Sequence, residues 1–277
     1  MIELIRKIAL VLTIGIGLSG TAQGQSSYDL FGNARSDALG QGTTGTTSMV
    51  DAHANPAAPA LGSGAAVLLY TRQSFGLPAL RYGASMVLVP FAWGTLSTGA
   101  STFGFEDYRE LHFTAGYARR FQLGTSRPLH LGGGARYHHV SIPRYGSTGA
   151  LGIQVGGLIR VLRSLQFGFR VTNLNGAALV DGAPLPRTLA VGLSYRALRR
   201  LLVVADVFKD VRYPAAVRGG VEVRPVSVLA LRAGVTTTPV QFAGGIGVRL
   251  SPVRADVAAV QHQELGWSPS ASLQFRW

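Results

Sequence analysis

The feature that most constrains the fold is a strict alternation of apolar and polar side chains along much of the chain. In LQFGFRVTN, Leu165, Phe167 and Phe169 share one face, while Gln166 and Arg170 share the other. A period of two residues is typical of a β-strand whose faces meet different surroundings. The polar face is small and cationic, which suits a water-lined lumen better than the interior of a β-sandwich. The pattern predicts a transmembrane antiparallel β-barrel with its apolar face toward lipid.

The part of the chain assigned to the barrel, residues 64–277, divides at Gly, Pro, Ser and Asp turn signals into about 14 strand-like segments. The segments are 64–74, 79–91, 93–104, 108–122, 128–141, 148–161, 163–174, 187–197, 199–209, 214–224, 226–237, 239–250, 252–262 and 266–277. A membrane strand needs about 9 to 11 residues and bacterial barrels use even numbers of strands, so 12 strands remain an alternative.

Two segments, LLVVADVF and SVLALRAGV, carry apolar residues partly on both faces. This predicts that something fills the lumen beside them. The preceding residues 25–63 are rich in Gly, Ala, Thr and Asn and lack strand periodicity. We interpret them as a small N-terminal plug or hatch; the alternative is a disordered periplasmic leader. Within this segment, Asp51 and Asn55 are expected to hydrogen-bond the backbone of a local turn.

The first 24 residues have the features of a cleaved signal peptide. Arg6 and Lys7 precede an apolar run from Ile8 to Leu18, which is shorter than the roughly 18 residues of a membrane helix. Small residues before Gln25 predict cleavage there; an uncleaved anchor helix is the alternative. The chain has no cysteine, which excludes disulfides and a lipoprotein anchor.

The formal net charge is +13, yet the basic residues are scattered singly and form no basic helix, which argues against nucleic-acid binding. The alternation predicts a lumenal cationic face made of Arg136, Arg170, Arg232, Arg249 and Arg276. We expect these arginines to pair with Asp37 and Asp51 of the plug or to hydrate the lumen. The alternative is that they bind the carboxylate or phosphate of a ligand through forked hydrogen bonds.

No sequence motif for catalysis, nucleotide binding or metal binding is present. His138 and His139 are adjacent, so on a strand they face opposite sides and do not share a metal ion. We therefore expect no enzyme activity, no cofactor and no metal. Aromatic residues near segment ends are expected in the two interfacial girdles: Tyr82, Trp93, Tyr108, Tyr195 and Trp267.

An ordered set of short blocks resembles the PorV/PorQ group of outer-membrane proteins, relatives of the FadL-type barrels. The blocks are ARSDALGQG, DAHANPAAPA, ELHFTAGYARRF, VTNLN, LPRTLAVGLSY, VRGGVEVRPVSVLALRAG and LGWSPSASLQFRW. The first two match the N-terminal motif of the group and assign plug-motif roles to Ala34, Arg35, Ser36, Leu39, Gly40, Asp51, Asn55 and Pro56. The chain departs from the group at Ala54, where a bulky residue is common, and its predicted surface loops are short.

The resemblance implies an outer membrane location in a Gram-negative bacterium, with both ends of the barrel in the periplasm. It implies that Leu273, Phe275 and Trp277 form a terminal signal read by the barrel-insertion machinery. It also implies a non-enzymatic role in type IX secretion or in surface attachment of secreted proteins, with secretion components or cargo as partners beside outer-membrane lipid. The alternative is a FadL-like transporter of hydrophobic or amphipathic small molecules.

Overall fold

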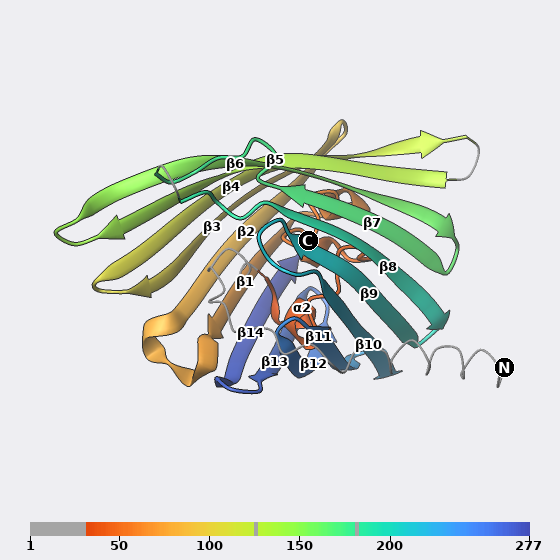
Figure 1. The fold of residues 1–277 in the computed structure, drawn as a ribbon. Helices are drawn as coiled ribbons and strands as arrows, with labels where there is room; N and C mark the ends of the chain where they lie inside the picture. Colours follow the sequence, from red (N-terminus) through yellow and green to blue (C-terminus); the bar gives the residue numbers. More distant parts are fainter. Residues whose placement is uncertain (1–31, 125–126, 181–182) are drawn as a thin grey trace.

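The computed structural model describes residues 32–124, 127–180 and 183–277 (Figure 1). They form one closed barrel in which consecutive strands pair antiparallel and β14 pairs with β1. The strands are β1 (Ala66–Gln73), β2 (Arg81–Phe91), β3 (Gly94–Phe105), β4 (Tyr108–Leu123), β5 (Arg127–Ile142), β6 (Gly146–Leu162), β7 (Leu165–Thr172), β8 (Thr188–Leu198), β9 (Leu201–Asp210), β10 (Ala216–Val226), β11 (Leu229–Thr237), β12 (Val240–Leu250), β13 (Val253–His262) and β14 (Gly266–Arg276). The predicted closed barrel is confirmed, with 14 strands rather than 12.

The barrel has two rims that differ in their connections. We call the rim where β1 begins and β14 ends the terminal rim. Every even-numbered strand ends there, and its turns are as short as residues 199–200 and 251–252. The opposite rim carries the longest connection, residues 173–187 between β7 and β8.

The long connection covers the edge that β6 exposes where it extends beyond β7. The pairing of these strands runs only as far as Val155 and Val171. Beyond it, Leu174 N donates to Ile153 O at 2.9 Å, and the side chain of Asn175 bonds Ile153 N and Leu151 O at 2.9 and 2.8 Å. The backbone groups of Leu151 and Ile153 therefore have hydrogen-bond partners on this side of β6 although no strand lies beside them.

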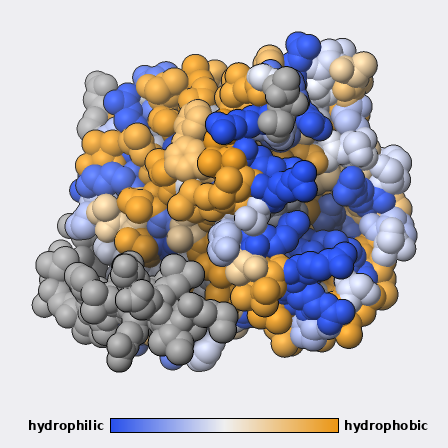
Figure 2. Space-filling view, turned by 90° about the vertical axis from the view of Figure 1, so that its right-hand side faces the viewer, coloured by the Kyte–Doolittle hydropathy of each residue, from blue (hydrophilic) through white to orange (hydrophobic). Residues whose placement is uncertain are grey.

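The outer face of the wall is apolar, as the alternation predicts. Phe113, Leu193 and Leu273 are exposed, whereas residues of opposite parity on the same strands, such as His112 and Ser194, are buried. Figure 2 shows hydrophobic residues spread over much of one side of the molecule, beside a hydrophilic area. None of the described helices is long and apolar enough to cross a membrane.

The predicted aromatic girdle is correct only in part. Trp93, Tyr195 and Trp267 are exposed on the wall. Tyr82 is instead fully buried in the lumen, because it has the same parity as the inward-facing Met86 on β2. Tyr108 is half-buried, and its hydroxyl donates to the inward-facing Glu110 at 2.6 Å.

Residues 32–63, which we call the lumenal segment, lie inside the barrel (Figure 1). The segment contains α2 (Ala34–Ala38) and the short 3-10 helices η2 (Met49–Asp51) and η3 (Ala58–Leu61). Two further 3-10 turns, η4 (Ser74–Gly76) and η5 (Pro78–Leu80), connect β1 to β2. The predicted signal peptide, 1–24, and residues 25–31 of the predicted plug lie outside the described residues.

Small residues on the segment and on the wall allow their backbones to approach closely. Gly40 has φ of +62°, and a Cβ there would lie 2.6 Å from Val235 O. On the other side of the lumen, a Cβ on Gly132 would lie 2.1 Å from Pro56 O. The inward-facing Leu202 and Val204 pack on Leu39, which explains why LLVVADVF is apolar on both faces.

We expect an arginine on the outer face to destabilise the barrel according to its depth in the membrane. Leu193 lies in the middle of β8 and Leu198 at its terminal-rim end. Leu193→Arg should lower the free energy of unfolding by about 2–4 kcal/mol, and Leu198→Arg by about 0–1 kcal/mol. Urea unfolding in lipid vesicles measures both. Equal losses would contradict the assignment of this face to the bilayer.

Candidate functional site in the barrel lumen

The lumenal segment is held in shape by Asn33, the N-cap of α2. Its Oδ1 accepts from Ser36 N at 2.7 Å, which satisfies one of the free N–H groups of the first turn. Its Nδ2 donates to Val50 O at 2.8 Å and to Asp51 Oδ1 at 3.0 Å. One side chain therefore ties α2 to η2 and positions Asp51 beside Arg35.

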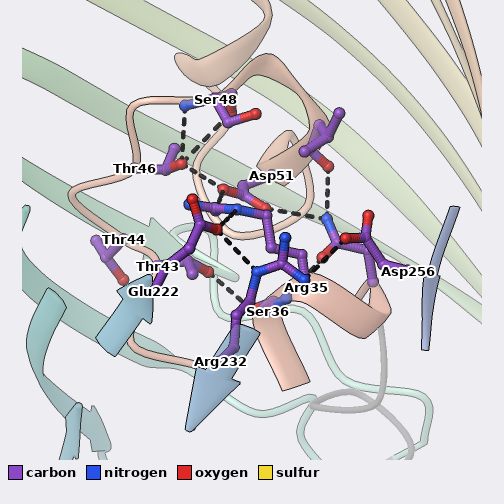
Figure 3. Close-up of polar contacts among 12 residues, drawn as sticks. Arg35, Ser36, Thr43, Thr44, Thr46, Ser48, Asp51, Glu222, Arg232 and Asp256 are labelled. Atoms are coloured by element: carbon purple, nitrogen blue, oxygen red, sulfur yellow. Dashed lines mark hydrogen bonds and ion pairs between the residues drawn. The ribbon is translucent and has the colours of Figure 1, made fainter. Parts of the chain in front are cut away.

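Arg35 joins the segment to the wall at the centre of a buried ionic network (Figure 3). Its Nη1 lies 2.5 Å from Asp51 Oδ2, and its Nε lies 3.0 Å from Oε2 of Glu222 on β10. Arg232 Nε contacts the same Glu222 oxygen at 2.8 Å, and Arg232 Nη1 contacts Asp256 Oδ1 at 2.8 Å. The network therefore crosses from α2 to β10, β11 and β13.

Two arginines complete the network on the side of the terminal rim. Arg224 Nη2 lies 2.6 Å from Glu222 Oε1, and Arg254 Nε lies 2.8 Å from Asp256 Oδ2. Burying an unpaired charge is costly, so each carboxylate here requires its arginines and each buried arginine its carboxylates. Burial opposes ionisation of Arg35, but Asp51 and Glu222 outweigh it and raise its pKa. Arg35 is therefore permanently charged.

Further hydrogen bonds attach the segment all around the lumen. Asp37 accepts from Tyr70 Oη at 2.6 Å and from Ser270 Oγ at 2.7 Å. Thr44 N donates to Asp206 Oδ2 at 2.8 Å. Asn55 Nδ2 donates at 3.2 Å to the carbonyl oxygens of Gly157 and Phe169. Asn55 Oδ1 also accepts from Ala57 N at 3.0 Å, the local turn bond expected of an Asx residue.

Two small cavities separate the segment from the wall. The first, the apolar cavity, lies against the inner face of β14, β1 and β2, where Val50, Leu68, Tyr70 and Met86 line it. The second, the cationic cavity, is lined by Arg136, Arg170, Arg218, Asp37 and Thr172, among others. Each cavity has a volume of about 30 Å³, which is enough for about two water molecules.

The two cavities share two lining residues, Gly32 and His53. Arg170 Nη1 donates to His53 O at 3.0 Å, which holds His53 against β7. Burial lowers the pKa of His53 to about 4; the charge of Asp51 opposes this shift, and those of Arg170 and Arg136 add to it. At neutral pH His53 is therefore uncharged, and arginine supplies the positive charge of the site.

The structure places the eight plug-motif residues together in the lumen. Ala34, Arg35 and Ser36 lie on α2, Leu39 and Gly40 follow it, and Asp51, Asn55 and Pro56 lie on or after η2. All eight are buried, and Gly40 packs against β11, where a Cβ would lie 2.6 Å from Val235 O. The role of these residues in function stays a prediction.

The predicted lumenal cationic face divides into two groups. Arg136 and Arg232 are buried and Arg170 is half-buried in the lumen, whereas Arg249 and Arg276 face inward but are exposed at the terminal rim. The expected partners of these arginines, Asp37 and Asp51, instead bind Arg72 and Arg35 at 3.4 and 2.5 Å. From the sequence, Arg35 was predicted only as a plug-motif residue and Arg72 was not predicted.

Sequence analysis also missed the carboxylates on the inner wall. Alternation alone places Glu222 on the same face of β10 as Arg218, and Asp256 on the same face of β13 as Arg254. The alternation therefore predicts the face of these carboxylates as well as that of the arginines. In the part of the chain that the structure describes, no three His, Asp or Glu side chains form a group able to hold a metal ion.

The C-terminal residues Leu273, Phe275 and Trp277 are exposed on the outer side, at 46%, 45% and 63%. The close pairing of β14 with β1 and β13 leaves no free edge, as expected for the closing strand. Their reading by insertion machinery stays a prediction.

Comparison with known proteins shows the fold. No family model and no curated protein matches the chain. The solved structures it is similar to include the toluene transporter TodX of Pseudomonas putida, with a TM-score of 0.59 and 13% identity over 88% of this chain and 97% of that one. The monoaromatic hydrocarbon channel CymD gives 0.58, 12% identity and coverage of 80% and 91%. The outer membrane protein Omp33 of Acinetobacter baumannii gives 0.54, 9% identity and coverage of 77% and 98%. These likenesses show that the chain has the fold of these barrels, a closed antiparallel barrel of the TodX type.

Removing Arg35 should loosen the lumenal segment. Arg35→Ala leaves Asp51 short of its cation in a buried site, and we expect it to lower the free energy of unfolding by about 3–5 kcal/mol. Arg212→Ala is the matched control, because Arg212 is 41% exposed and lies 3.7 Å from Asp210. A surface pair of this kind contributes about 0–1 kcal/mol. Urea unfolding in vesicles measures both variants; similar losses would show that the network does not stabilise the barrel.

Proposed function

We propose that this protein is an outer-membrane channel for small amphipathic molecules that carry an anionic group. The observation that carries the proposal is that an apolar and a cationic cavity lie side by side in the lumen and share the lining residues Gly32 and His53. A molecule bound across these two residues would place its chain against Leu68 and Met86 and its anionic group toward Arg136 and Arg170. Arginine binds carboxylate, sulfonate and phosphate groups through paired N–H donors.

The architecture of the similar proteins supports a transport role. TodX is described as a toluene transporter and CymD as a monoaromatic hydrocarbon channel. Both share a 14-strand type of barrel with this chain at low sequence identity. The arginines around the cationic cavity add a preference for an anionic group on an otherwise apolar molecule.

The lumenal segment acts as the gate in this proposal. Each cavity has room for about two waters, so a larger molecule requires the segment to move. The side of the segment that faces β1 and β2 contributes Met49 and Ala52 to an apolar cluster. The side that faces β10, β11 and β13 is held by the ion pairs of Arg35. Movement of Met49 and Ala52 away from β2 therefore breaks apolar contacts rather than ion pairs.

The test compares two permanently charged amphiphiles of equal chain length in vesicles that contain the purified protein. We expect octanesulfonate to leave preloaded vesicles at least about tenfold faster than octyltrimethylammonium. Ala84→Phe fills the apolar cavity and should abolish the flux, whereas Ala100→Phe, on the neighbouring strand with its side chain toward lipid, should not. Equal leakage from vesicles with and without protein would refute the proposal.

A second candidate is the role in type IX secretion, favoured by the ordered sequence blocks that resemble the PorV/PorQ group. Several of these blocks contain the residues of the buried network, including Arg35, Asp51, Glu222 and Arg232. In this role the barrel anchors a secretion component or cargo through its rims. Affinity purification of the tagged protein from outer membranes of its own host tests this. Co-purification of secretion components supports it; their absence, together with a flux of octanesulfonate, favours the channel.

A further inference from the structure

The charges of the barrel are strongly segregated between its two rims. The stretches that form the terminal rim contain no acidic residue: 89–96, 119–130, 158–167, 195–202, 223–230, 248–254 and 273–277. The same stretches contain Arg119, Arg120, Arg127, Arg160, Arg163, Arg196, Arg199, Arg200, Arg224, Arg249, Arg254 and Arg276. At the opposite rim, basic residues alternate with acidic ones, including Glu106, Asp107, Asp210 and Glu264. Among the described residues, the terminal rim is therefore the one that carries basic side chains without acidic ones.

A subset of these arginines recurs on six of the seven even-numbered strands; β2 is the exception. Each strand β4, β6, β8, β10, β12 and β14 has an arginine close to its terminal-rim end: Arg120, Arg160, Arg196, Arg224, Arg249 and Arg276, which we call the mouth ring. Each has the parity of buried, inward-facing residues on its strand, such as Ala118 before Arg120 and Ser194 before Arg196. The mouth ring therefore faces the opening rather than the lipid.

The mouth ring is accessible to a ligand. Five of its members are exposed, and Arg224 is half-exposed and bonded to Glu222. The recurrence of an arginine at the inner side of six strand ends does not arise from the lipid-facing alternation, because that alternation concerns the outer face. Nor does neutralisation of the lumen require the five members other than Arg224, since Glu222 and Asp256 already contact Arg35, Arg232 and Arg254.

We infer that the mouth ring is an anion-binding vestibule that draws carboxylate, sulfonate or phosphate groups into the terminal mouth. A mouth lined with charges of one sign focuses the electrostatic potential and raises the local concentration of the opposite ion. Arginine also retains forked donors for an oxyanion that arrives there. For the channel described under Proposed function, on which this role in transport rests, the ring supplies the selectivity for anions at one end of the path.

The first experiment measures anion binding directly and does not depend on transport. Pyranine, a soluble dye with several sulfonates, is titrated with the detergent-solubilised protein, and binding is followed by fluorescence anisotropy. The ring variant carries Arg120→Gln, Arg160→Gln and Arg196→Gln. The control variant carries Arg119→Gln, Arg127→Gln and Arg199→Gln, which remove the same charge at the same rim. Arg119 and Arg127 have the parity of the outer face, and Arg199 lies in a turn.

We expect the ring variant to raise the Kd for pyranine about tenfold at low salt and the control to change it less than about twofold. The difference should vanish near 1 M salt, where the screening length falls to about 3 Å. Equal weakening in both variants would show a diffuse rim charge and overturn the inference, as would unchanged binding in the ring variant. Both variants must keep the heat-modifiable gel mobility of a folded barrel.

The second experiment separates this inference from the proposed function. Octanesulfonate flux through the ring variant should fall about tenfold at low salt and recover at high salt, with the control variant unchanged. If the wild-type protein binds pyranine through the ring but passes no amphiphile, the channel proposal fails and the vestibule stands. If the wild-type protein passes octanesulfonate but the ring variant does so equally well, the vestibule has no role in transport and that part of the inference fails.

Discussion

The structure depends on one constraint: backbone N–H and C=O groups that face hydrocarbon have no water to bond, so each must find a partner within the protein. Closure of β14 onto β1 meets this constraint over the whole ring of strands. Closure in turn creates an interior that the wall alone does not fill. The same alternation that presents Phe113 and Leu193 to lipid therefore directs His112, Ser194 and other polar groups inward. The lumenal segment fills this interior.

Charge sets the position of that segment. Arg35, Glu222 and Arg232 are each almost completely buried, and such groups are tolerated only with their partners in place. Asn33 holds Asp51 beside Arg35, and Arg35 also contacts Glu222 on the wall. The same residues therefore fix both the local structure of the segment and its attachment to the wall. The network is thus less a source of stability than a determinant of where the segment sits. Close backbone approach at Gly40 and Gly132 then fixes its depth.

Most of the fold was predictable from the sequence, because a period of two residues and a turn every dozen or so residues are local signals. The predicted segment 79–91 corresponds to β2 and 187–197 to β8, each displaced by only one or two residues. The prediction of Tyr82 in the interfacial girdle was wrong, because it rested on the residue being a tyrosine near a strand end. Its even position on β2 indicates the lumen, which the other even positions of β2 also face. The path of residues 32–63 follows from contacts across the lumen, and no local pattern encodes such contacts.

The sequence predicts which arginines face the candidate site, but not the contacts that they make there. Alternation places Arg136, Arg170 and Arg232 on the inner face, but it does not say which of them meets a carboxylate. That choice depends on the segment, which brings its own Arg35 to Glu222 and its own Asp51 to Arg35. Arg249 and Arg276 share the parity of the lumenal arginines, yet they lie at strand ends and are exposed. Parity gives the face of a residue, and only its distance from the strand end gives its depth.

The division of contacts around the segment has a consequence for how the barrel would open. Toward β10, β11 and β13 the contacts are ion pairs at 2.8 and 3.0 Å, and their loss would leave charges buried. Between η2 and β2 the contacts are apolar, and Met49 and Met86 are among them, whereas β1 also holds Asp37 through Tyr70 and Arg72. Methionine adapts its shape at little cost, so this side can repack around a guest molecule. A segment anchored on one side and adaptable on the other can act as a hinged gate without leaving the lumen.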